Sequence, residues 1–464
     1  MNAHAIAGLV ALNLWLLGVG IAVLFALRGW RSWGELVRLS GVAYIVGVAV
    51  NGVVWVWELV VGIDLGLAEI FVTGLAIAVL ASLAGYRLGR RLPPRGGWPP
   101  VARLSALGAV FGSLIAVYLE ALFRSGRLGG LYEFDAWAFW VPKAKAIYFF
   151  GGFDHQFFRE LINQSYPPLV PALQAAAFHF MGAPDVVTVR LQYWFLFAGF
   201  VGAVLGLLSG RVNALFLWPP LLFVLVTPNL VGHALQAQAD FPLDEFFAIA
   251  ALLVALWLME RRDWQLVAAS LLLAAAMMTK REGYAFAASV VIAALIVTWR
   301  ERRAAWPKLV AAGVVAAAAT VPWRIFLGVR HLSSGGPELS GTGLLSHGDR
   351  AWPSLRLALS TLFDYDLWLV VVPLGLVAVA AAFAAGARRL PAYVALVYVF
   401  MVAAFAYGTW AFPSLGFSRN PALNPIVRLT GGFILLTLVL VPLLLSRAWR
   451  GRQAPALGLE RVVE

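Results

Sequence analysis

The sequence predicts an all-α polytopic membrane protein, and three observations lead to this fold class. Of the 464 residues, 62% are hydrophobic and only 12% are charged, whereas about a quarter of the residues in a soluble domain are charged. The apolar runs are roughly twenty residues long, which is the length of helix that crosses the hydrocarbon core of a bilayer. An outer-membrane barrel would show shorter segments of alternating polarity instead.

Apolar runs of spanning length occur about thirteen times along the chain. We expect spans at 5–27, 41–61, 66–86, 103–123, 190–209, 213–231, 241–259, 264–279, 284–299, 307–326, 366–386, 391–410 and 429–446. The first three form an N-terminal module at 1–102, the others a second module at 103–446, and a tail follows at 447–464. Residues 166–182 are also apolar, but their prolines stand at the start, so we expect an extracytoplasmic juxtamembrane helix that lies at the interface.

Basic residues occupy every second short loop, and Lys and Arg are enriched in cytoplasmic loops. We therefore expect a multi-pass protein of the plasma (inner) membrane, with its N-terminus outside and its C-terminus cytoplasmic. The basic side carries Arg28, Arg31, Arg38, Arg87, Arg90, Arg91, Arg95, Arg103, Arg211, Arg261, Arg262, Arg300, Arg302, Arg303, Lys308, Arg388, Arg389, Arg447, Arg450 and Arg452. The membrane thus explains the net charge of +12 without a nucleic-acid partner.

Function is expected on the opposite side, which holds the long loops 124–189, 327–365 and 411–428. Long loops on a rigid scaffold carry much of a protein's function. The sequence contains no GxxxxGK[ST] motif and no GxGxxG between a strand and a helix, so no nucleotide site is predicted. An activated group for chemistry at the outer face must then arrive on a lipid.

The stretch 131–168 carries the first candidate site. Carboxylates beside a membrane are costly, which favours a functional role for Glu133 and Asp135, and a partly buried carboxylate can accept a proton from a hydroxyl group. The alternative is that Asp135 caps the following helix. Lys143 and Lys145 could neutralise a lipid phosphate or extend to the headgroups, and their spacing places them on different helix faces.

A second acidic cluster contains Asp240, Asp244 and Glu245 in the segment QAQADFPLDEFF. Asp240 and Asp244 are four residues apart and therefore share a helix face. The two carboxylates could bind an acceptor or a divalent cation, or Asp240 could only cap its helix. The six histidines show no metal-ligand spacing, so the metal, if there is one, is unknown.

Two adjacent cations, Lys280 and Arg281, lie in the segment 279–283 on the predicted outer side, against the usual distribution of charge. A phosphate or pyrophosphate headgroup would bind to such a pair, with Lys as a point charge and Arg as a fork. The alternative is a simple hairpin turn. Arg324 and Arg428 stand at other outer helix ends, and either could join a phosphate site.

These residues resemble the motifs of the GT-C glycosyltransferases, membrane enzymes that use polyprenyl-phosphate sugars. The similarity extends over roughly residues 103–446, and the chain resembles the superfamily of protein mannosyltransferases and aminoarabinose transferases. The matching motifs, in chain order, are Asp135, Tyr166-Pro167-Pro168-Leu169, Arg190-Leu191, Ala239-Asp240, Thr279 to Gly283, Pro322-Trp323 and Arg428. The family usually places its acidic loop after the first span, whereas three apolar runs precede it here.

The resemblance implies an inverting transfer of a hexosyl or pentosyl group in the cell envelope. The donor would be a polyprenyl-phosphate sugar, and the acceptor a hydroxyl group of a lipid, glycan or protein. Asp135 would be the base, with Glu133 as the second catalytic carboxylate. Lys280, Arg281 and Arg428 would bind the donor phosphate.

Other residues have supporting roles in this hypothesis. Asp240 would form an acceptor or second acidic site, and Lys143, Tyr166, Arg190 and Arg324 would assist. The sequence identifies no particular cofactor, and the acidic cluster leaves room for a divalent cation. Two alternatives are a polyprenyl-lipid flippase or transporter and a lipid-binding membrane subunit without chemistry. The absence of an internal repeat and the few charges at mid-bilayer depth argue against a transporter.

Overall fold

A computed structural model describes residues 3–93, 105–153, 156–332, 339, 341–412 and 425–456. In these ranges all regular elements are helices, and nine of them are long and apolar enough to span a membrane, which confirms the predicted all-α class. These are α1 (Ala3–Arg28), α3 (Ser40–Val60), α4 (Leu67–Arg87), α5 (Ala106–Gly126), α9 (Arg190–Leu208), α12 (Asp240–Glu260), the continuous stretch Trp299–Val329, α21 (Arg389–Ala411) and α23 (Pro425–Ala456). The stretch Trp299–Val329 consists of η2 (Trp299–Glu301), α15 (Arg302–Ala318) and α16 (Val321–Val329).

Four other predicted spans form shorter apolar helices. They are α10 (Ala214–Val226), α13 (Asp263–Thr279), α14 (Glu282–Val297) and α20 (Val371–Ala384). The remaining helices lie in the connections: α2 (Trp33–Arg38), η1 (Ala136–Trp140), α6 (Val141–Phe150), α7 (Gln156–Glu160), α8 (Leu169–Met181), α11 (Pro228–His233), α17 (Thr342–Ser346), η3 (Gly348–Arg350), α18 (Ala351–Leu362) and α19 (Tyr365–Trp368). Parts of the predicted loops 327–365 and 411–428, the end of the tail 447–464, and Arg95 and Arg103 lie outside the described residues.

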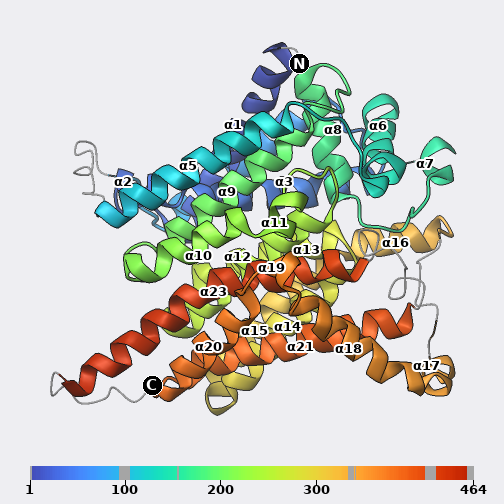
Figure 1. Ribbon diagram of the computed structural model, residues 1–464. Coiled ribbons are helices and arrows are strands. Elements are labelled where there is room, and N and C mark those ends of the chain that lie inside the picture. Colours follow the sequence, from blue (N-terminus) through green and yellow to red (C-terminus); the bar gives the residue numbers. More distant parts are fainter. Residues whose placement is uncertain are drawn as a thin grey trace.

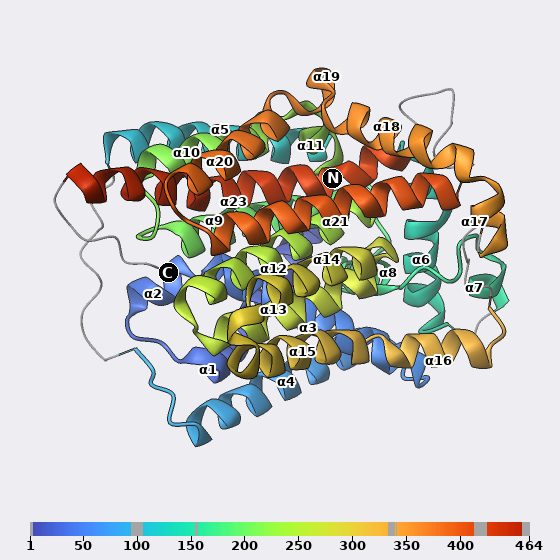
Figure 2. The same ribbon diagram turned by 90° about the horizontal axis from the view of Figure 1, so that it is seen from below.

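The basic loops gather at one end of the bundle, here called the basic end. Glu301, before α15, forms ion pairs with both Arg261 and Arg389. Arg211, after α9, pairs with Glu260 at 2.5 Å. In Figures 1 and 2, α2 and the C-terminal part of α23 lie at this end, whereas α6, α7 and α17 lie at the other. The predicted alternation of loops therefore corresponds to two chemically different ends of the bundle.

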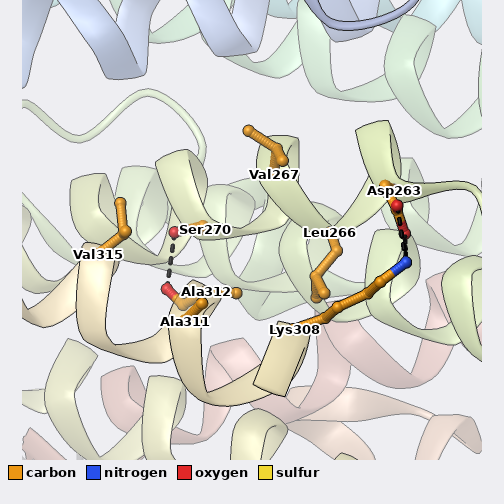
Figure 3. A pocket seen from close by; sticks show the side chains of 8 residues that line it. All are labelled: Asp263, Leu266, Val267, Ser270, Lys308, Ala311, Ala312 and Val315. Carbon is orange, nitrogen blue, oxygen red and sulfur yellow. Dashed lines mark hydrogen bonds and ion pairs between the residues drawn. The ribbon is translucent and has the colours of Figure 1, made fainter. Parts of the chain in front are cut away.

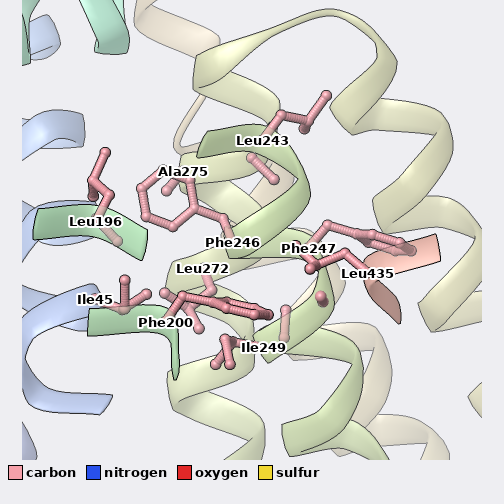
Figure 4. Packing of buried hydrophobic residues seen from close by; sticks show 14 of the residues in the cluster. Ile45, Leu196, Phe200, Leu243, Phe246, Phe247, Ile249, Leu272, Ala275 and Leu435 are labelled. Atoms are coloured by element: carbon pink, nitrogen blue, oxygen red, sulfur yellow. The ribbon is translucent and has the colours of Figure 1, made fainter. Parts of the chain in front are cut away.

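Helix α12 forms the centre of the bundle, and all 18 residues of its most apolar window are buried. Such a helix is apolar on every side, as expected where it has no lipid-facing surface. Around Phe246 and Phe247, α12 packs against Leu196 of α9 and Leu272 of α13, and Ile45 of α3 lies beside Phe200 of α9 (Figure 4). The position of its first residue, Asp240, is therefore set by packing on all sides.

Helix α8 differs from the sequence-based expectation of an interfacial helix. It begins at Leu169 after Pro168, as the prolines predict, but every residue from Leu169 to Phe178 is buried. The neighbours α1, α3 and α6 cover it on several sides. The apolar surface that suggested membrane contact is therefore buried against protein, because the N-terminal module packs over it.

Candidate functional site

A chain of ion pairs lies at the end of the bundle opposite the basic end and forms the candidate site. Arg428 forms an ion pair with Asp135 and donates a hydrogen bond of 2.9 Å to the side-chain oxygen of Gln238. Its Nη1 atom is 3.9 Å from Oδ2 of Asp240. Lys280 Nζ is 2.7 Å from Oδ1 of Asp240 and 3.2 Å from Glu282. We call Asp135, Arg428, Asp240, Lys280 and Glu282 the ion-pair cluster.

The members of this cluster come from helix ends that are far apart in the sequence. Asp135 directly precedes η1, a short π-helical segment, and such segments are frequent at functional sites. Asp240 is the first residue of the buried helix α12, and Lys280 is an extended residue between α13 and α14. Arg428 lies in the first turns of α23. The packing of the bundle thus brings four distant helix ends together.

Two glycines allow this convergence. A Cβ atom on Gly432 would lie 2.6 Å from Oδ1 of Asp244, so only glycine lets α23 approach α12 here, one turn beyond Arg428. A Cβ atom on Gly283 would lie 2.3 Å from the carbonyl oxygen of Ala276, which is why the tight link between α13 and α14 requires glycine. The hairpin turn at Gly283 therefore also positions Lys280. The turn and the phosphate-binding interpretation of this segment do not exclude each other.

Arg281 points away from the carboxylates toward the loop before α8. It donates a hydrogen bond to Ser165 Oγ, and its guanidinium lies 5.0 Å from the ring centre of Tyr166. Tyr166 stacks on Phe139 at 5.9 Å between ring centres. Burial raises the pKa of Tyr166, and Glu282 adds to this effect. The phenol therefore stays neutral and provides a platform for Arg281.

Lys143 lies behind this platform and is completely buried, which corrects both interpretations made from the sequence. It donates a hydrogen bond to the backbone carbonyl of Asn163 and lies 5.4 Å from the ring centre of Phe139. Burial, with a smaller contribution from Arg281, lowers the pKa of Lys143 to about 7. In this structure Lys143 reaches neither a headgroup nor a lipid phosphate, because aromatic rings enclose it.

The structure also contradicts the two capping interpretations. Asp135 has helical backbone angles and its side chain makes no capping hydrogen bond to the described helix that follows. Asp240 is the first helical residue rather than the cap, and its Oδ1 atom accepts a hydrogen bond from Lys280. Both carboxylates are therefore used in ion pairs. Glu133 lies two residues before Asp135 but joins none of the ion pairs of the cluster.

Asp240 and Asp244 have different closest neighbours, although they share a helix and interact electrostatically with each other and with Lys280. Asp244 packs against Gly431 and Gly432 of α23, whereas Asp240 faces Lys280. Glu245 is buried within α12, and its two oxygens accept no hydrogen bond from the described residues. No group of three or more His, Asp or Glu side chains in the described part of the chain is placed to hold a metal ion.

Arg190 and Arg324 lie outside the ion-pair cluster. The buried Arg190 donates hydrogen bonds to the carbonyl oxygens of Gly129, at 2.8 Å, and Leu235, at 3.2 Å. It thereby fixes the loop that leads to Asp135. The exposed Arg324 contacts Tyr284, with its Nε atom 3.2 Å from the phenol oxygen. Arg190 is therefore a structural residue, and Arg324 lies at the rim of the site.

The cluster contains two cations, Arg428 and Lys280, and three carboxylates, those of Asp135, Asp240 and Glu282. Burial alone would lower the pKa of Lys280, but Asp240 and Glu282 outweigh burial and raise the pKa above its ordinary value. The ammonium group therefore stays charged. Oδ2 of Asp240 accepts no hydrogen bond from the described residues. The site thus holds strongly charged groups of both signs at a buried helix end, where electrostatic interactions are stronger than in water.

Sequence reasoning missed three members of this region. Gln238 binds Arg428, and Ser165 binds Arg281. His233 interacts electrostatically with Asp240, and burial lowers the pKa of this histidine to about 4. Gln238 lies two positions before Asp240, and Ser165 lies one position before Tyr166, both of which were identified from the sequence. His233 precedes Asp240 by seven positions, but no metal-ligand or catalytic spacing in the sequence singles it out.

The chain was compared with protein-family models, with curated proteins and with solved structures, and none of them matches it.

Proposed function

We propose that the protein is a GT-C-like glycosyltransferase with about thirteen spans, acting at the extracytoplasmic face of the membrane. It would transfer a sugar from a polyprenyl phosphate to a hydroxyl acceptor with inversion. The observation that carries this proposal is the pairing of Asp135 with Arg428 beside Lys280. A carboxylate that can accept a proton thus lies next to cations that can bind a departing phosphate.

The reaction requires few groups. The acceptor oxygen attacks the anomeric carbon, its proton passes to the carboxylate of Asp135, and the bond between that carbon and the phosphate oxygen breaks. The electron pair of this bond remains on the polyprenyl phosphate, which is a stable anion and needs no general acid. Arg428 and Lys280 would stabilise the charge that develops on the leaving oxygen. A general base typically contributes about 10²–10⁴-fold in rate.

Substrate binding and base activation would be linked in this site. In the structure the carboxylate of Asp135 is engaged by Arg428, whose neighbours also include Gln238 and Asp240. A donor phosphate that binds Arg428 would compete with Asp135 for the same guanidinium. The carboxylate would then be released to accept a proton only when the donor is present. This arrangement would limit side reactions before the donor binds.

A groove that reaches Tyr284, two residues after Glu282 of the cluster, could receive the polyprenyl chain. It has a volume of about 290 Å³ and is lined by apolar residues of α13, α14 and α15, including Met277 and Val291. Tyr284 lines the groove and also contacts Arg324 at the rim. A cation at the mouth and apolar walls below fit a lipid phosphate with a hydrocarbon tail.

The proposal is tested by reconstituting the purified protein into vesicles with polyprenyl phosphates that carry a radiolabelled hexose or pentose. Release of the polyprenyl phosphate with transfer or hydrolysis of the labelled sugar is the expected result. Movement of the intact lipid to the other leaflet would instead establish a flippase. Tight binding with neither reaction nor movement would indicate the non-catalytic lipid-binding subunit.

A further inference from the structure

A second charged cavity lies at the basic end, far from the ion-pair cluster. It has a volume of about 390 Å³, and its lining includes Arg28, Arg31, Arg90, Arg262, Asp263 and Trp264. We call it the arginine pocket. Its walls come from the end of α1, from the chain after α4 and from the start of α13. The pocket therefore lies where the N-terminal helices meet the central part of the bundle.

Arg28 is the most buried cation of this pocket, with only 8% of its side chain exposed. Its guanidinium lies 5.1 Å from the ring centre of Trp264 and forms an ion pair with Glu35 through Nη2. The Nε and Nη1 atoms have no hydrogen-bond partner among the described residues. Because unpaired buried donors of a charged group are costly, these two atoms are suited to donate hydrogen bonds to an anionic ligand.

The lining holds four arginines and one carboxylate, so the pocket keeps an excess of positive charge although Arg262 pairs with Glu260 at 3.3 Å. Arg90 donates a hydrogen bond of 3.1 Å to the carbonyl oxygen of Ala26, which carries no net charge. Asp263, the one carboxylate of the lining, is paired with Lys308 at 2.8 Å. Nearby, burial and Arg211 lower the pKa of Arg38, and Arg28 and Arg262 contribute to the same effect.

An apolar groove of about 300 Å³ begins at the same Asp263 and extends between α13 and α15. Figure 3 shows its residues, with Leu266 and Ser270 on α13 and Ala311 and Ala312 on α15. The Asp263–Lys308 ion pair lies at the end of the groove next to the arginine pocket. The cationic cavity and the hydrocarbon-lined groove therefore adjoin at Asp263, which lines both.

We propose that the arginine pocket and this groove bind one anionic phospholipid, with its phosphate against Arg28 and Arg262 and an acyl chain between α13 and α15. Guanidinium groups bind phosphate oxygens through paired hydrogen bonds, and basic pockets between transmembrane helices are suited to lipid headgroups. A free phosphate would use only the pocket and leave the adjoining groove unexplained. The groove therefore favours a lipid over a soluble anion.

The position of this lipid would matter for the whole bundle. The backbone N–H of Trp30, two residues after α1, donates a hydrogen bond of 2.8 Å to the carbonyl oxygen of Arg91. This bond holds the chain after α4 next to the pocket. Helix α13 begins at Asp263 in the pocket and ends at Thr279, next to Lys280. A bound lipid would therefore stabilise the N-terminal helices against the helix that carries the phosphate-binding lysine.

The test uses the full-length, delipidated protein and measures lipid binding by native mass spectrometry and by the shift in Tm. Phosphatidylglycerol and cardiolipin are compared with phosphatidylcholine and with inorganic phosphate. We expect the anionic lipids to bind and raise Tm, whereas phosphatidylcholine and inorganic phosphate have little effect. Equal stabilisation by inorganic phosphate alone would show a soluble-anion site and overturn the lipid assignment, as would equal binding of all lipids.

Variants separate the pocket from the groove. Replacing the exposed Arg31 together with Arg262, as Arg31→Gln/Arg262→Gln, should weaken anionic lipid binding about 30-fold, or about 5-fold for each arginine. Arg303→Gln, an exposed arginine outside the pocket, is the matched control and should have little effect. Wild-type lipid affinity in the double variant would overturn the proposal.

For the groove, Ala311→Trp should weaken lipid binding because the indole fills the space for the chain. Ala318→Trp, an exposed position on the same helix outside this groove, is the control. If both tryptophan variants bind lipid as the wild type does, the acyl chain does not use the groove and the proposal fails. Because these residues are remote from the ion-pair cluster, sugar transfer is measured separately and does not decide the outcome.

Discussion

Asp135 and Arg428 are 293 positions apart in the sequence, yet they form an ion pair at the end of the bundle. The same guanidinium binds Gln238 at 2.9 Å and lies 3.9 Å from Asp240. Arg428 therefore connects the loop before η1 with the start of the buried helix α12. This single side chain links the proposed base to the proposed phosphate site, and the predictions below depend on that link.

The membrane orientation can be tested with single cysteines, because the natural chain contains none. Ser346 in α17 and Ala304 at the start of α15 are both exposed and lie at opposite ends of the bundle. We expect an impermeant maleimide added to intact cells to label Ser346→Cys but not Ala304→Cys. Lysed cells serve as the control, since both should then react. The reverse pattern would place the ion-pair cluster in the cytoplasm and exclude the proposed donor.

The close approach of α12 and α23 should depend on Gly432. Gly432→Ala places a methyl group 2.6 Å from Oδ1 of Asp244, and overpacking of this kind typically costs about 1–3 kcal/mol. We expect a lower Tm together with slower sugar transfer, because Arg428 shifts with its helix. Gly408→Ala is the control, since no atom lies within 4 Å of the position that its added methyl group would take. The same Tm and the same transfer rate in both variants would show that neither stability nor transfer depends on the contact between Gly432 and Asp244.

Lys143 should make stability depend on pH. Burial lowers the pKa of Lys143 to about 7, so between that value and the ordinary lysine pKa of about 10.4 the unfolded chain binds more protons. The free energy of unfolding should therefore rise with pH across this range. Thermal unfolding in nanodiscs from pH 7 to 10 measures this effect. The rise should be smaller in Lys143→Met and unchanged in Lys145→Met, and identical pH profiles in all three proteins would contradict the assignment.

The ion pair between Lys280 and Asp240 should stabilise the fold, whereas the charge of Lys280 should also be needed for sugar transfer. Lys280→Ala leaves the buried carboxylate of Asp240 without its closest partner, which typically costs about 3–5 kcal/mol. Adding Asp240→Asn should recover much of the Tm but not the rate of transfer, because the cation for the phosphate is still missing. Arg124→Ala, which breaks an exposed ion pair with Glu120, should cost no more than about 1 kcal/mol. Full recovery of transfer in the double variant would exclude Lys280 from the phosphate site.

The helices could be predicted from the sequence because hydrophobic length and loop charge are local signals. The grouping of basic loops at one end follows from the same signals. The burial of α8 could not be predicted, since its apolar residues are equally suited to a lipid interface and to a protein interior. Only the N-terminal helices that pack over it decide between the two.

The site could be predicted in part. Asp135, Asp240, Lys280 and Arg428 were each singled out as charged residues at outer helix ends, and the structure brings them together. The pairing of Asp135 with Arg428 could not be predicted, because a contact over 293 positions leaves no local pattern. Lys143 shows the limit most clearly. The sequence suggested that it neutralises a lipid phosphate or extends to the headgroups, whereas the surrounding aromatic rings bury it.

The most direct test of the central claim measures donor binding and turnover separately in Asp135→Asn. The donor is a polyprenyl-phosphate sugar that the wild-type protein has been shown to use. The substitution keeps the shape of the side chain but removes the charge that accepts the proton and holds Arg428. We expect turnover to fall about 10²–10⁴-fold, whereas donor binding is retained or becomes tighter because Arg428 is free. Near-wild-type turnover in this variant, or loss of donor binding with unchanged turnover of the bound donor, would contradict the account.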